Sequence, residues 1–197
     1  MNFLCHMVLS GNDDQLLVGN FMGDFVKGPL AERFPPRIRQ GVQLHRRIDS
    51  FAERHPLFRQ SRHRIDPAYG LYRGVLVDLF YDYFLANDWD TWCAEPFASW
   101  LARTRREVER HRADLPADMQ RLVPIIFDEL LPAYGTIAGI EMALGRLSRR
   151  IGRPNPLATG AAELRRHRAE LQADFRAFMP QVRQYVREVI AAGEGTD

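Results

Sequence analysis

The sequence predicts an all-α protein, a single-domain helical bundle over residues 1–197. Apolar residues recur at the three- to four-residue spacing of amphipathic helices, and we find no convincing run of alternating β-branched residues. The chain has 197 residues, of which 46% are hydrophobic. This is enough to build one core that buries most of the surface of the unfolded chain.

Capping and helix-breaking residues bound the helices expected in the first half. Asn12 or Asp13 can cap one helix, and Pro35-Pro36 opens another, because proline is favoured in a first helical turn. Asp66-Pro67 ends a third, since proline disfavours helical geometry in the residue before it. The expected helices run from the cap to about Val26, from Pro36 to about Arg54, from Pro56 to before Asp66, and from Leu71 to Ala86.

The second half is expected to continue as helices after an aromatic loop at residues 87–92. The best linker in the chain is Gly152-Arg153-Pro154-Asn155-Pro156. A long final helix is expected from about Thr159, with a kink at Pro180. The helices expected before the linker run from Glu95 to Arg112, from Pro116 to about Leu131, and from Gly135 to Ile151.

The cysteine content and the lack of a long apolar run indicate the cellular compartment of the protein. Cys5 and Cys93 are too few for a disulfide framework or a thiolate zinc site, so we expect a reducing, cytoplasmic setting. The sequence lacks the ~20 continuous apolar residues of a membrane span and the basic start of a secretory signal. We therefore expect no membrane insertion, and the sequence leaves the oligomeric state open.

Charge is unevenly distributed, although the formal net charge is only +2. Residues 27–64 carry ten Lys and Arg and three Asp and Glu, a local sum of 10 − 3 = +7. This segment favours an acidic protein partner, and we expect no nucleic acid. Its densest part is also typical of a solubilising face: Arg54, Arg59, Arg62, His63 and Arg64.

The most informative motif is GVQLHRRIDSF, because it places His45 and Asp49 four residues apart. On a helix, that spacing puts the imidazole and the carboxylate on one face, where both can bind a divalent cation. The alternative interpretation is an ordinary hydrogen-bonded pair on a solvated helix. Beside this pair, Arg46 and Arg47 point in directions about 100° apart, so we expect only one of them to border a site and bind a phosphate.

Further polar residues interrupt apolar sequence. Asp78 and Asp82 repeat the four-residue spacing in VLVDLFYDYFL, and a buried carboxylate needs a strong partner. Asp24 lies in the apolar stretch FMGDFV, where it could instead cap a helix or pair with an arginine. His6 could likewise be a core histidine whose hydrogen bonds are satisfied. Two imidazoles and three carboxylates would form a mixed set suited to Mn²⁺, Mg²⁺ or Fe²⁺. The proposed set is His6, Asp24, His45, Asp49 and Asp78.

Four blocks of the sequence resemble the acyl carrier protein phosphodiesterase family. They are MNFLCH, VGNFMGDFVKG, FPPRIRQGVQLHRRID and VDLFYDYFL, which cover residues 1 to about 89 in order. The remaining helical part is similar more loosely. The family looks like an atypical, metal-dependent branch of the HD-type phosphohydrolases. Where its pattern often has further histidines, this sequence has Val8, Gln43 and Tyr83.

The resemblance implies removal of the 4′-phosphopantetheine arm from holo-acyl carrier protein by a metal-activated water. Mn²⁺ is the most expected metal, and Mg²⁺ or Fe²⁺ is the alternative. The metal ligands implied are His6, Asp24, His45, Asp49 and Asp78. The catalytic group implied is Asp24, His45 and Asp49, with Asp82, Arg46 and Arg47 as further candidates.

Two other functions stay open at this point. One is an HD-type phosphohydrolase that acts on a nucleotide or another small phosphoester. The other is a non-enzymatic helical module that binds an acidic protein, in which the His and Asp residues form only a buried polar network.

Overall fold

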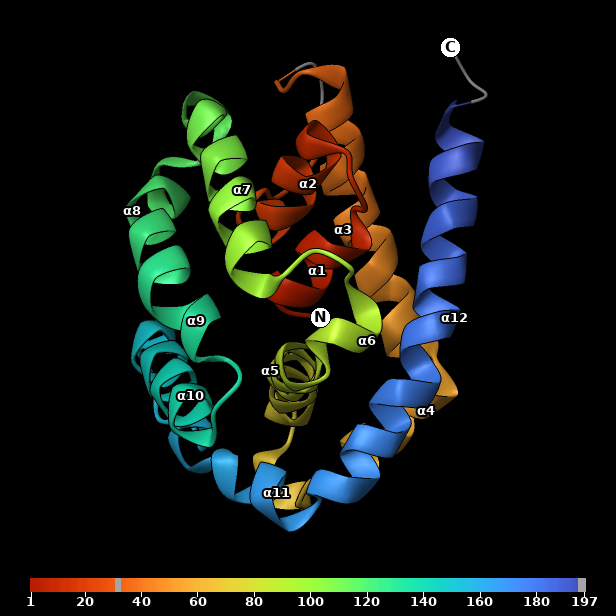
Figure 1. Cartoon of the computed structure of the whole chain (residues 1–197). Coiled ribbons are helices and arrows are strands. Elements are labelled where there is room, and N and C mark those ends of the chain that lie inside the picture. Colours follow the sequence, from red (N-terminus) through yellow and green to blue (C-terminus); the bar gives the residue numbers. More distant parts are fainter. Residues whose placement is uncertain (31–32, 195–197) are drawn as a thin grey trace.

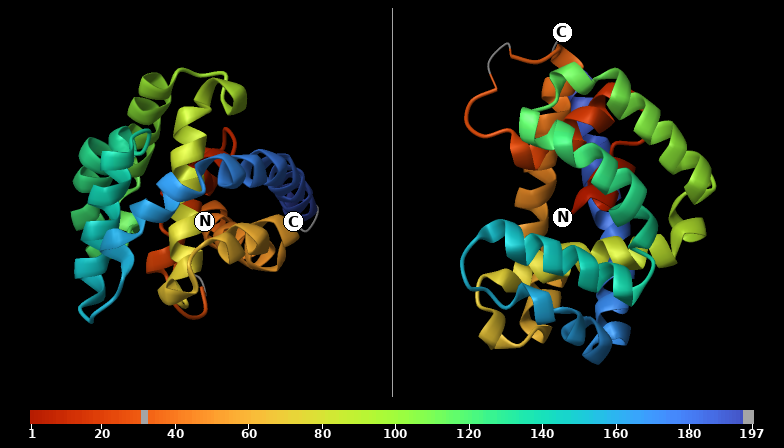
Figure 2. Two further views of the ribbon diagram at one scale, coloured as in Figure 1. Left: turned by 90° about the horizontal axis from the view of Figure 1, so that it is seen from below. Right: turned by 90° about the vertical axis from the view of Figure 1, so that its left-hand side faces the viewer.

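The all-α prediction is confirmed by the computed structural model, which describes residues 1–30 and 33–194, without the side chain of Glu194. Over these ranges the chain forms helices and turns, and no strand. Figure 1 shows the helix α5 almost end-on at the centre, with the N-terminal helices beside it. The helices α8–α10 lie on one flank and α12 on the other, and a view from below shows the same arrangement (Figure 2).

The helix boundaries of the first half follow the capping residues. The side chain of Asp13 accepts a hydrogen bond from the Leu16 amide at 2.7 Å and so begins α2. Pro36 and Pro56 lie in the first turns of α3 and α4, as predicted. The elements are α1 (Phe3–Leu9), α2 (Asp14–Phe21), η1 (Gly23–Phe25), α3 (Pro36–Arg54), α4 (Pro56–Arg64), η2 (Pro67–Tyr69) and α5 (Tyr72–Asn87).

The second half differs from the prediction in three places. The segment 87–92, expected to be an aromatic loop, contains the short helix α6. The expected final helix is broken at His167, and α12 continues through Pro180 as a curved helix (Figure 1). The helix after Pro116 becomes π-helical just beyond Pro124, which has no N–H to donate. The elements are α6 (Trp89–Trp92), α7 (Phe97–Arg110), η3 (Arg112–Asp114), α8 (Ala117–Ile125), η4 (Ile126–Leu130), α9 (Leu131–Ala133), α10 (Ile137–Ile151), η5 (Leu157–Thr159), α11 (Ala161–Arg166) and α12 (Arg168–Glu194).

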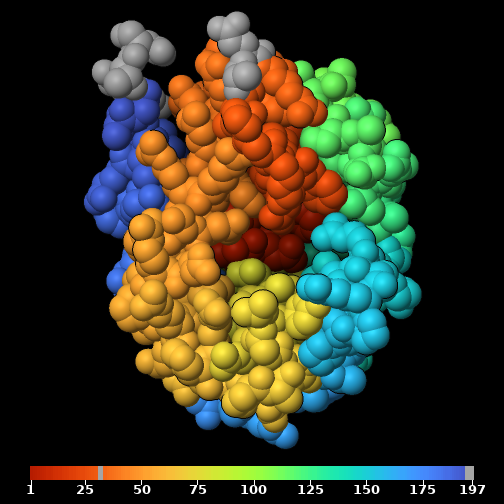
Figure 3. All heavy atoms as spheres, turned by 180° about the vertical axis from the view of Figure 1, so that it is seen from behind, coloured from red at the N-terminus to blue at the C-terminus, as the bar shows by residue number. Residues whose placement is uncertain are grey.

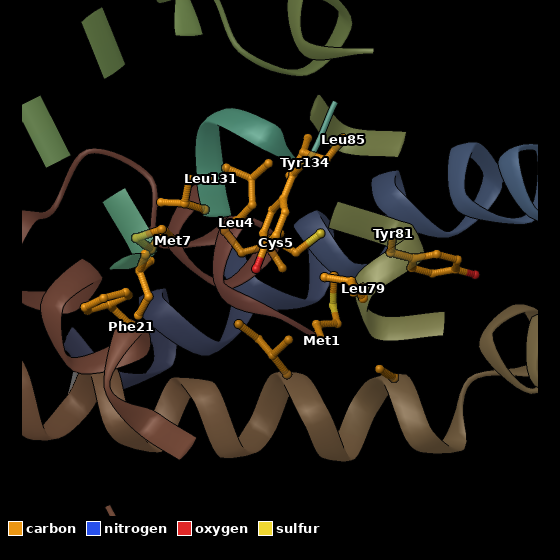
Figure 4. Close-up of a cluster of buried hydrophobic side chains, with 14 of the residues drawn as sticks. Met1, Leu4, Cys5, Met7, Phe21, Leu79, Tyr81, Leu85, Leu131 and Tyr134 are labelled. Atoms are coloured by element: carbon orange, nitrogen blue, oxygen red, sulfur yellow. The ribbon is translucent and has the colours of Figure 1, made fainter. Parts of the chain in front are cut away.

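The core surrounds the short helix α1. Figure 4 shows Leu4 and Cys5 of α1 among Leu85 of α5, Leu131 of α9 and Tyr134. Each of these five side chains is at most 1% exposed. Because apolar side chains surround α1, the polar residue that it carries, His6, has a fixed position relative to α5.

Two glycines bring α2 and α3 into backbone contact. A Cβ atom added at Gly19 would lie 2.0 Å from the carbonyl oxygen of Ile38, and one at Gly41 would lie 2.3 Å from that of Leu16. Neither position accepts a larger residue without moving a helix. This crossing brings the backbone at the end of α2 close to the middle of α3.

The C-terminal helix is tied to the first half by a buried polar network. Asp174 of α12 accepts hydrogen bonds from Arg64, Gln60 and Ser61 of α4, and Ser61 also bonds the Tyr81 hydroxyl. The buried carboxylate is therefore fully partnered. None of the described helices is both long enough and apolar enough to cross a membrane.

Candidate active site

The structure brings His6, His45 and Asp49 together from two helices. One nitrogen from each imidazole and one oxygen of Asp49 lie within 4.8 Å of one another. His6 Nε2 is 3.1 Å from Asp49 Oδ1, and His45 Nε2 is 3.3 Å from Asp49 Oδ2. The helical register predicted for His45 and Asp49 is confirmed, and His6 is added from α1. The three donors are close enough to bind one divalent cation.

The cluster has buried histidines and an open side. His6 and His45 are 1% and 4% exposed. The carboxylates of Asp24, Asp49 and Asp78 are 54%, 40% and 30% exposed, respectively. From behind, the surface is hollowed where the first residues lie between the orange α3 and α4 and the yellow start of α5 (Figure 3). A substrate can therefore approach the carboxylates, while the imidazoles are held in the protein.

Asp24 joins the cluster through His45. Its Oδ1 lies 3.4 Å from His45 Nε2, because the chain turns into η1 after α2 and passes over the imidazole ring. Gly23 makes this approach possible, since a Cβ there would lie 2.1 Å from Cγ of His45. Asp24 thus occupies the solvent side of His45, opposite the Nδ1 atom.

Asp78 is linked to the cluster by the positively charged amino group of Met1. The Met1 amino group lies 2.8 Å from Asp49 Oδ1 and 3.0 Å from Asp78 Oδ1. Burial works to lower the pKa of this amino group, but Asp78 and Asp49 together raise it to about 12. Two facing carboxylates thus share one cation in this structure. Asp78 is therefore one step further from the imidazoles than Asp49, and its expected role as a metal ligand stays a prediction.

The electrostatics of the cluster favour bound positive charge. The Met1 ammonium and His45 hold the pKa of Asp49 far below its usual range, although burial acts in the opposite direction. Burial opposes protonation of His45 as well, but Asp24 and Asp49 raise its pKa to about 9. Yet His45 Nε2 is buried and has no hydrogen-bond partner in the structure. A buried nitrogen that makes no regular hydrogen bond and lies 3.3–3.4 Å from two carboxylates fits a position at which a cation binds.

Asp82 has a different environment from the one expected. Both of its oxygens accept backbone N–H groups at 2.9 Å, from Leu4 and Cys5, and the residue is fully buried. The carboxylate thus satisfies the free amides at the start of α1, where no side chain of α1 itself forms a cap. Burial raises the pKa of Asp82 to about 6, although hydrogen bonds from Cys5 and Leu4 act against it. The expected direct catalytic role does not fit these contacts.

The two arginines beside His45 do point in different directions. Arg46 donates to the carbonyl oxygens of Val26 and Gly28, at 3.0 and 2.8 Å, in the loop that follows Asp24. Arg47 instead lines a groove with Leu16 and with Val189 of α12. Only Arg46 thus lies beside the loop that follows Asp24, in line with the expectation that one of the two arginines borders the site, and its role toward a phosphate stays a prediction.

The aromatic loop is used for packing. Trp89 is 5% exposed, packs against Phe97 and Trp100, and donates its Nε1 hydrogen to the Glu95 carbonyl. Trp92 packs on Phe175 of α12. These contacts match the structural interpretation of the two tryptophans.

Asn20 is a residue of the site that was not predicted from the sequence. It is fully buried on α2 and contacts both histidines, at 2.8 Å from His6 Nδ1 through Oδ1 and at 2.8 Å from His45 Nδ1 through its carbonyl oxygen. A signal was present, because Asn20 is a polar residue within the apolar run LLVGNFM and so needs buried partners.

Comparison of the sequence with known proteins identifies the family. The family model described as acyl carrier protein phosphodiesterase matches residues 1–182. A protein of that name from Photorhabdus laumondii is 30% identical over 182 residues, covering 91% of this chain and 92% of the relative. Proteins of the same name from Yersinia pestis and Pectobacterium atrosepticum are 29% and 27% identical, covering 91% and 95% of this chain and 94% and 98% of their own. No solved structure was found to match. With most of its length matched in this way, the chain belongs to the acyl carrier protein phosphodiesterase family.

Proposed function

We propose that this protein hydrolyses the phosphodiester that joins 4′-phosphopantetheine to the serine of holo-acyl carrier protein, giving the apo-carrier protein. Family membership supports the substrate, since the relatives are named for it. The observation that carries the chemistry is the meeting of His6 Nε2 and His45 Nε2 on the Asp49 carboxylate, which is 40% exposed to solvent.

We propose that His6, His45 and Asp49 hold a divalent metal, with Asp24 and Asp78 as further donors. The mixed nitrogen and oxygen set suits Mn²⁺, which we favour, or Mg²⁺ or Fe²⁺. The unpartnered buried His45 Nε2 supports this assignment. When bound, such an ion supplies a Lewis acid that polarises a phosphodiester and makes water more acidic.

We propose that Asp24 accepts the proton of the attacking water. It is the most exposed carboxylate of the cluster, and His45 keeps its pKa below the ordinary value in spite of burial. It is therefore ionised at neutral pH and reachable by water. Asp82 is a poor alternative, because its oxygens are bonded to the α1 backbone.

For the phosphate, we propose Arg46 rather than Arg47. Arg46 lies against Val26 and Gly28 in the loop after Asp24, whereas Arg47 faces α12. A guanidinium beside the carboxylates can offset the charge that develops on the non-bridging oxygens.

We propose that the carrier protein, which is acidic, docks on the basic segment 27–64. This segment supplies α3 and α4, which border the hollow in Figure 3. Arg59 of α4 is exposed and Arg62 is half-buried. Surface charges of this kind accelerate the encounter and orient the partner, and their effect falls as salt rises.

We further propose that residues 1–197 act as one domain in the cytoplasm. The bonds of Asp174 to α4 support a single folding unit, and the free thiols of Cys5 and Cys93 support a reducing compartment. The relation to the HD-type phosphohydrolases stays a prediction.

The activity is tested by incubating the protein with holo-acyl carrier protein and Mn²⁺, and measuring loss of the prosthetic group by mass spectrometry. We expect conversion to the apo-carrier protein, and its loss in Asp24→Ala. Asp90→Ala is the matched control, because it removes an exposed carboxylate from α6, outside the cluster.

The same assay separates the other two functions. Cleavage of a small phosphodiester such as bis(p-nitrophenyl) phosphate, with holo-carrier protein left intact, would favour a small-molecule phosphohydrolase. Cleavage of neither compound, together with no detectable binding of Mn²⁺, would overturn the proposal in favour of a non-enzymatic binding module.

A further inference from the structure

We infer that Asn20 is a positioning residue that orients both imidazoles, so that the Nε2 lone pairs of His6 and His45 face Asp49 and the proposed metal. This inference rests on the metal site proposed above, and it assigns the site an outer residue that holds its two nitrogen donors. The argument depends on which atoms around Asn20 can donate and which can only accept.

The amide of Asn20 has a fixed orientation. Its Nδ2 donates to the His6 carbonyl oxygen at 2.7 Å and to Ser10 Oγ at 2.9 Å. A carbonyl oxygen can only accept, and Ser10 Oγ already directs its own hydrogen to the His6 carbonyl, at 3.1 Å. Both contacts therefore need the NH₂ group, and the opposite side of the amide must be the oxygen Oδ1.

This orientation fixes the tautomer of His6. Asn20 Oδ1 accepts a hydrogen bond from the ring nitrogen Nδ1 at 2.8 Å, so Nδ1 carries the hydrogen. In the neutral imidazole the other nitrogen, Nε2, then has a lone pair. That lone pair points at Asp49 Oδ1, 3.1 Å away, which is repulsive unless a cation lies between the two atoms.

The backbone of the same residue fixes His45. The carbonyl oxygen of Asn20 accepts from His45 Nδ1 at 2.8 Å, so the neutral ring has its lone pair on Nε2, beside Asp24 and Asp49. The carbonyl reaches this far because Gly19, the preceding residue, lets α2 touch the backbone of α3. One residue thus holds two rings, one by its side chain and the other by its main chain.

Asn20 binds His6 through its side chain and His45 through its backbone carbonyl group, so a substitution can test the inference. Replacing Asn20 removes the partner of His6 and leaves the bond to His45 in place. In Asn20→Leu, which is similar in size and apolar, His6 gains by moving its hydrogen to Nε2 and donating it to Asp49. Such a nitrogen cannot bind a metal, so the affinity for Mn²⁺ should fall about 10- to 100-fold.

The first measurement uses the unaltered, metal-free protein at pH 7. Long-range ¹H–¹⁵N correlation spectra of the imidazoles should show hydrogen on Nδ1 of His6. A hydrogen on Nε2 would overturn the inference before any variant is made.

Two variants serve as controls. Asn20→Asp keeps an acceptor for His6 Nδ1, so the tautomer should persist and the Mn²⁺ affinity should stay within severalfold. Ser10→Ala removes one bond of the Asn20 amide and no contact to an imidazole ring, so tautomer and affinity should not change. A purely structural role would lower the melting temperature in all three variants and leave the His6 tautomer alone.

The outcomes are distinct. A folded Asn20→Leu protein with hydrogen still on Nδ1 of His6 and an unchanged calorimetric Kd for Mn²⁺ would overturn the inference. If Asn20→Leu does not fold, the wild-type spectrum and Asn20→Asp still decide it. Should the wild-type protein bind no Mn²⁺, the metal proposal fails, and the tautomer measurement still reports on Asn20.

Discussion

The imidazole rings of His6 and His45 stack face to face, with their centroids 3.8 Å apart and their planes inclined by 16°. Two rings at this distance repel each other when both are protonated. Burial and His45 together lower the pKa of His6 to about 4, whereas the pKa of His45 is raised to about 9 by Asp24 and Asp49, against the effect of burial. The stack therefore holds one proton, on His45, and accepts a second one poorly, so a metal ion that binds both Nε2 atoms must displace the proton of His45.

Metal binding should stabilise the folded protein through these nitrogens. A ligand at about 100 times its Kd adds about 2.7 kcal/mol, which corresponds to roughly 5–10 °C in Tm for a chain of this length. We expect Mn²⁺ to raise Tm in the wild-type protein and EDTA to reverse the change, as followed by calorimetry. His45→Gln should lose most of this increase, while His63→Gln, an exposed histidine on α4, should retain it. An equal increase in His45→Gln would contradict a site at this stack.

Gly23 should be necessary for the position of His45. In Gly23→Ala the new methyl group would lie 2.1 Å from Cγ of His45, so the ring must move away from Asp49. We expect the Mn²⁺ affinity and kcat/KM to fall at least about tenfold, because metal and catalytic sites tolerate little displacement. Gly135→Ala is the matched control, since a Cβ there meets nothing within 4 Å. Calorimetric titration of both variants gives the comparison, and equal affinities would disprove the role of Gly23.

Asp82 should make stability depend on pH between about 4 and 6. Burial raises its pKa from 3.8 in the unfolded chain to about 6 in the folded protein. The contribution of Asp82 to the free energy of unfolding is therefore fully present below pH 3.8 and is lost as the pH rises through 6. Relative to Asp82→Asn, wild-type protein should therefore lose up to about 3 kcal/mol of unfolding free energy over this range. Other carboxylates titrate in both proteins and cancel in the difference. Urea denaturation at several pH values measures it, and parallel curves for the two proteins would exclude a raised pKa.

The basic face of α4 should affect KM for the carrier protein more than kcat. Arg59→Glu combined with Arg62→Glu is expected to raise KM for holo-carrier protein severalfold at low salt while kcat is maintained, because encounter depends on surface charge. The control is Arg106→Glu with Arg110→Glu, which makes the same charge change on α7, away from α4. Steady-state kinetics at two salt concentrations test this, and an unchanged KM would remove the docking proposal.

Local sequence signals predicted the helices well. Prolines in first turns and the Asp13 cap fixed the starts of α2, α3 and α4, because these effects act within a few residues. The pairing of His45 with Asp49 was predictable for the same reason, since both lie on one helix at a known spacing. The break at His167 was missed, because no glycine or proline marks it.

The sequence by itself determined the fold class, most helix ends and the five residues to examine. Only the tertiary structure decided which groups these and other polar residues contact. Asp82 accepts hydrogen bonds from backbone amides 77 and 78 residues away in the sequence. Arg47 faces α12, and Asn20 contacts two histidines. Spacing along a helix specifies which residues share a face. Which other segment meets that face depends on how distant helices pack, and here it depends on glycines that allow two backbones to touch.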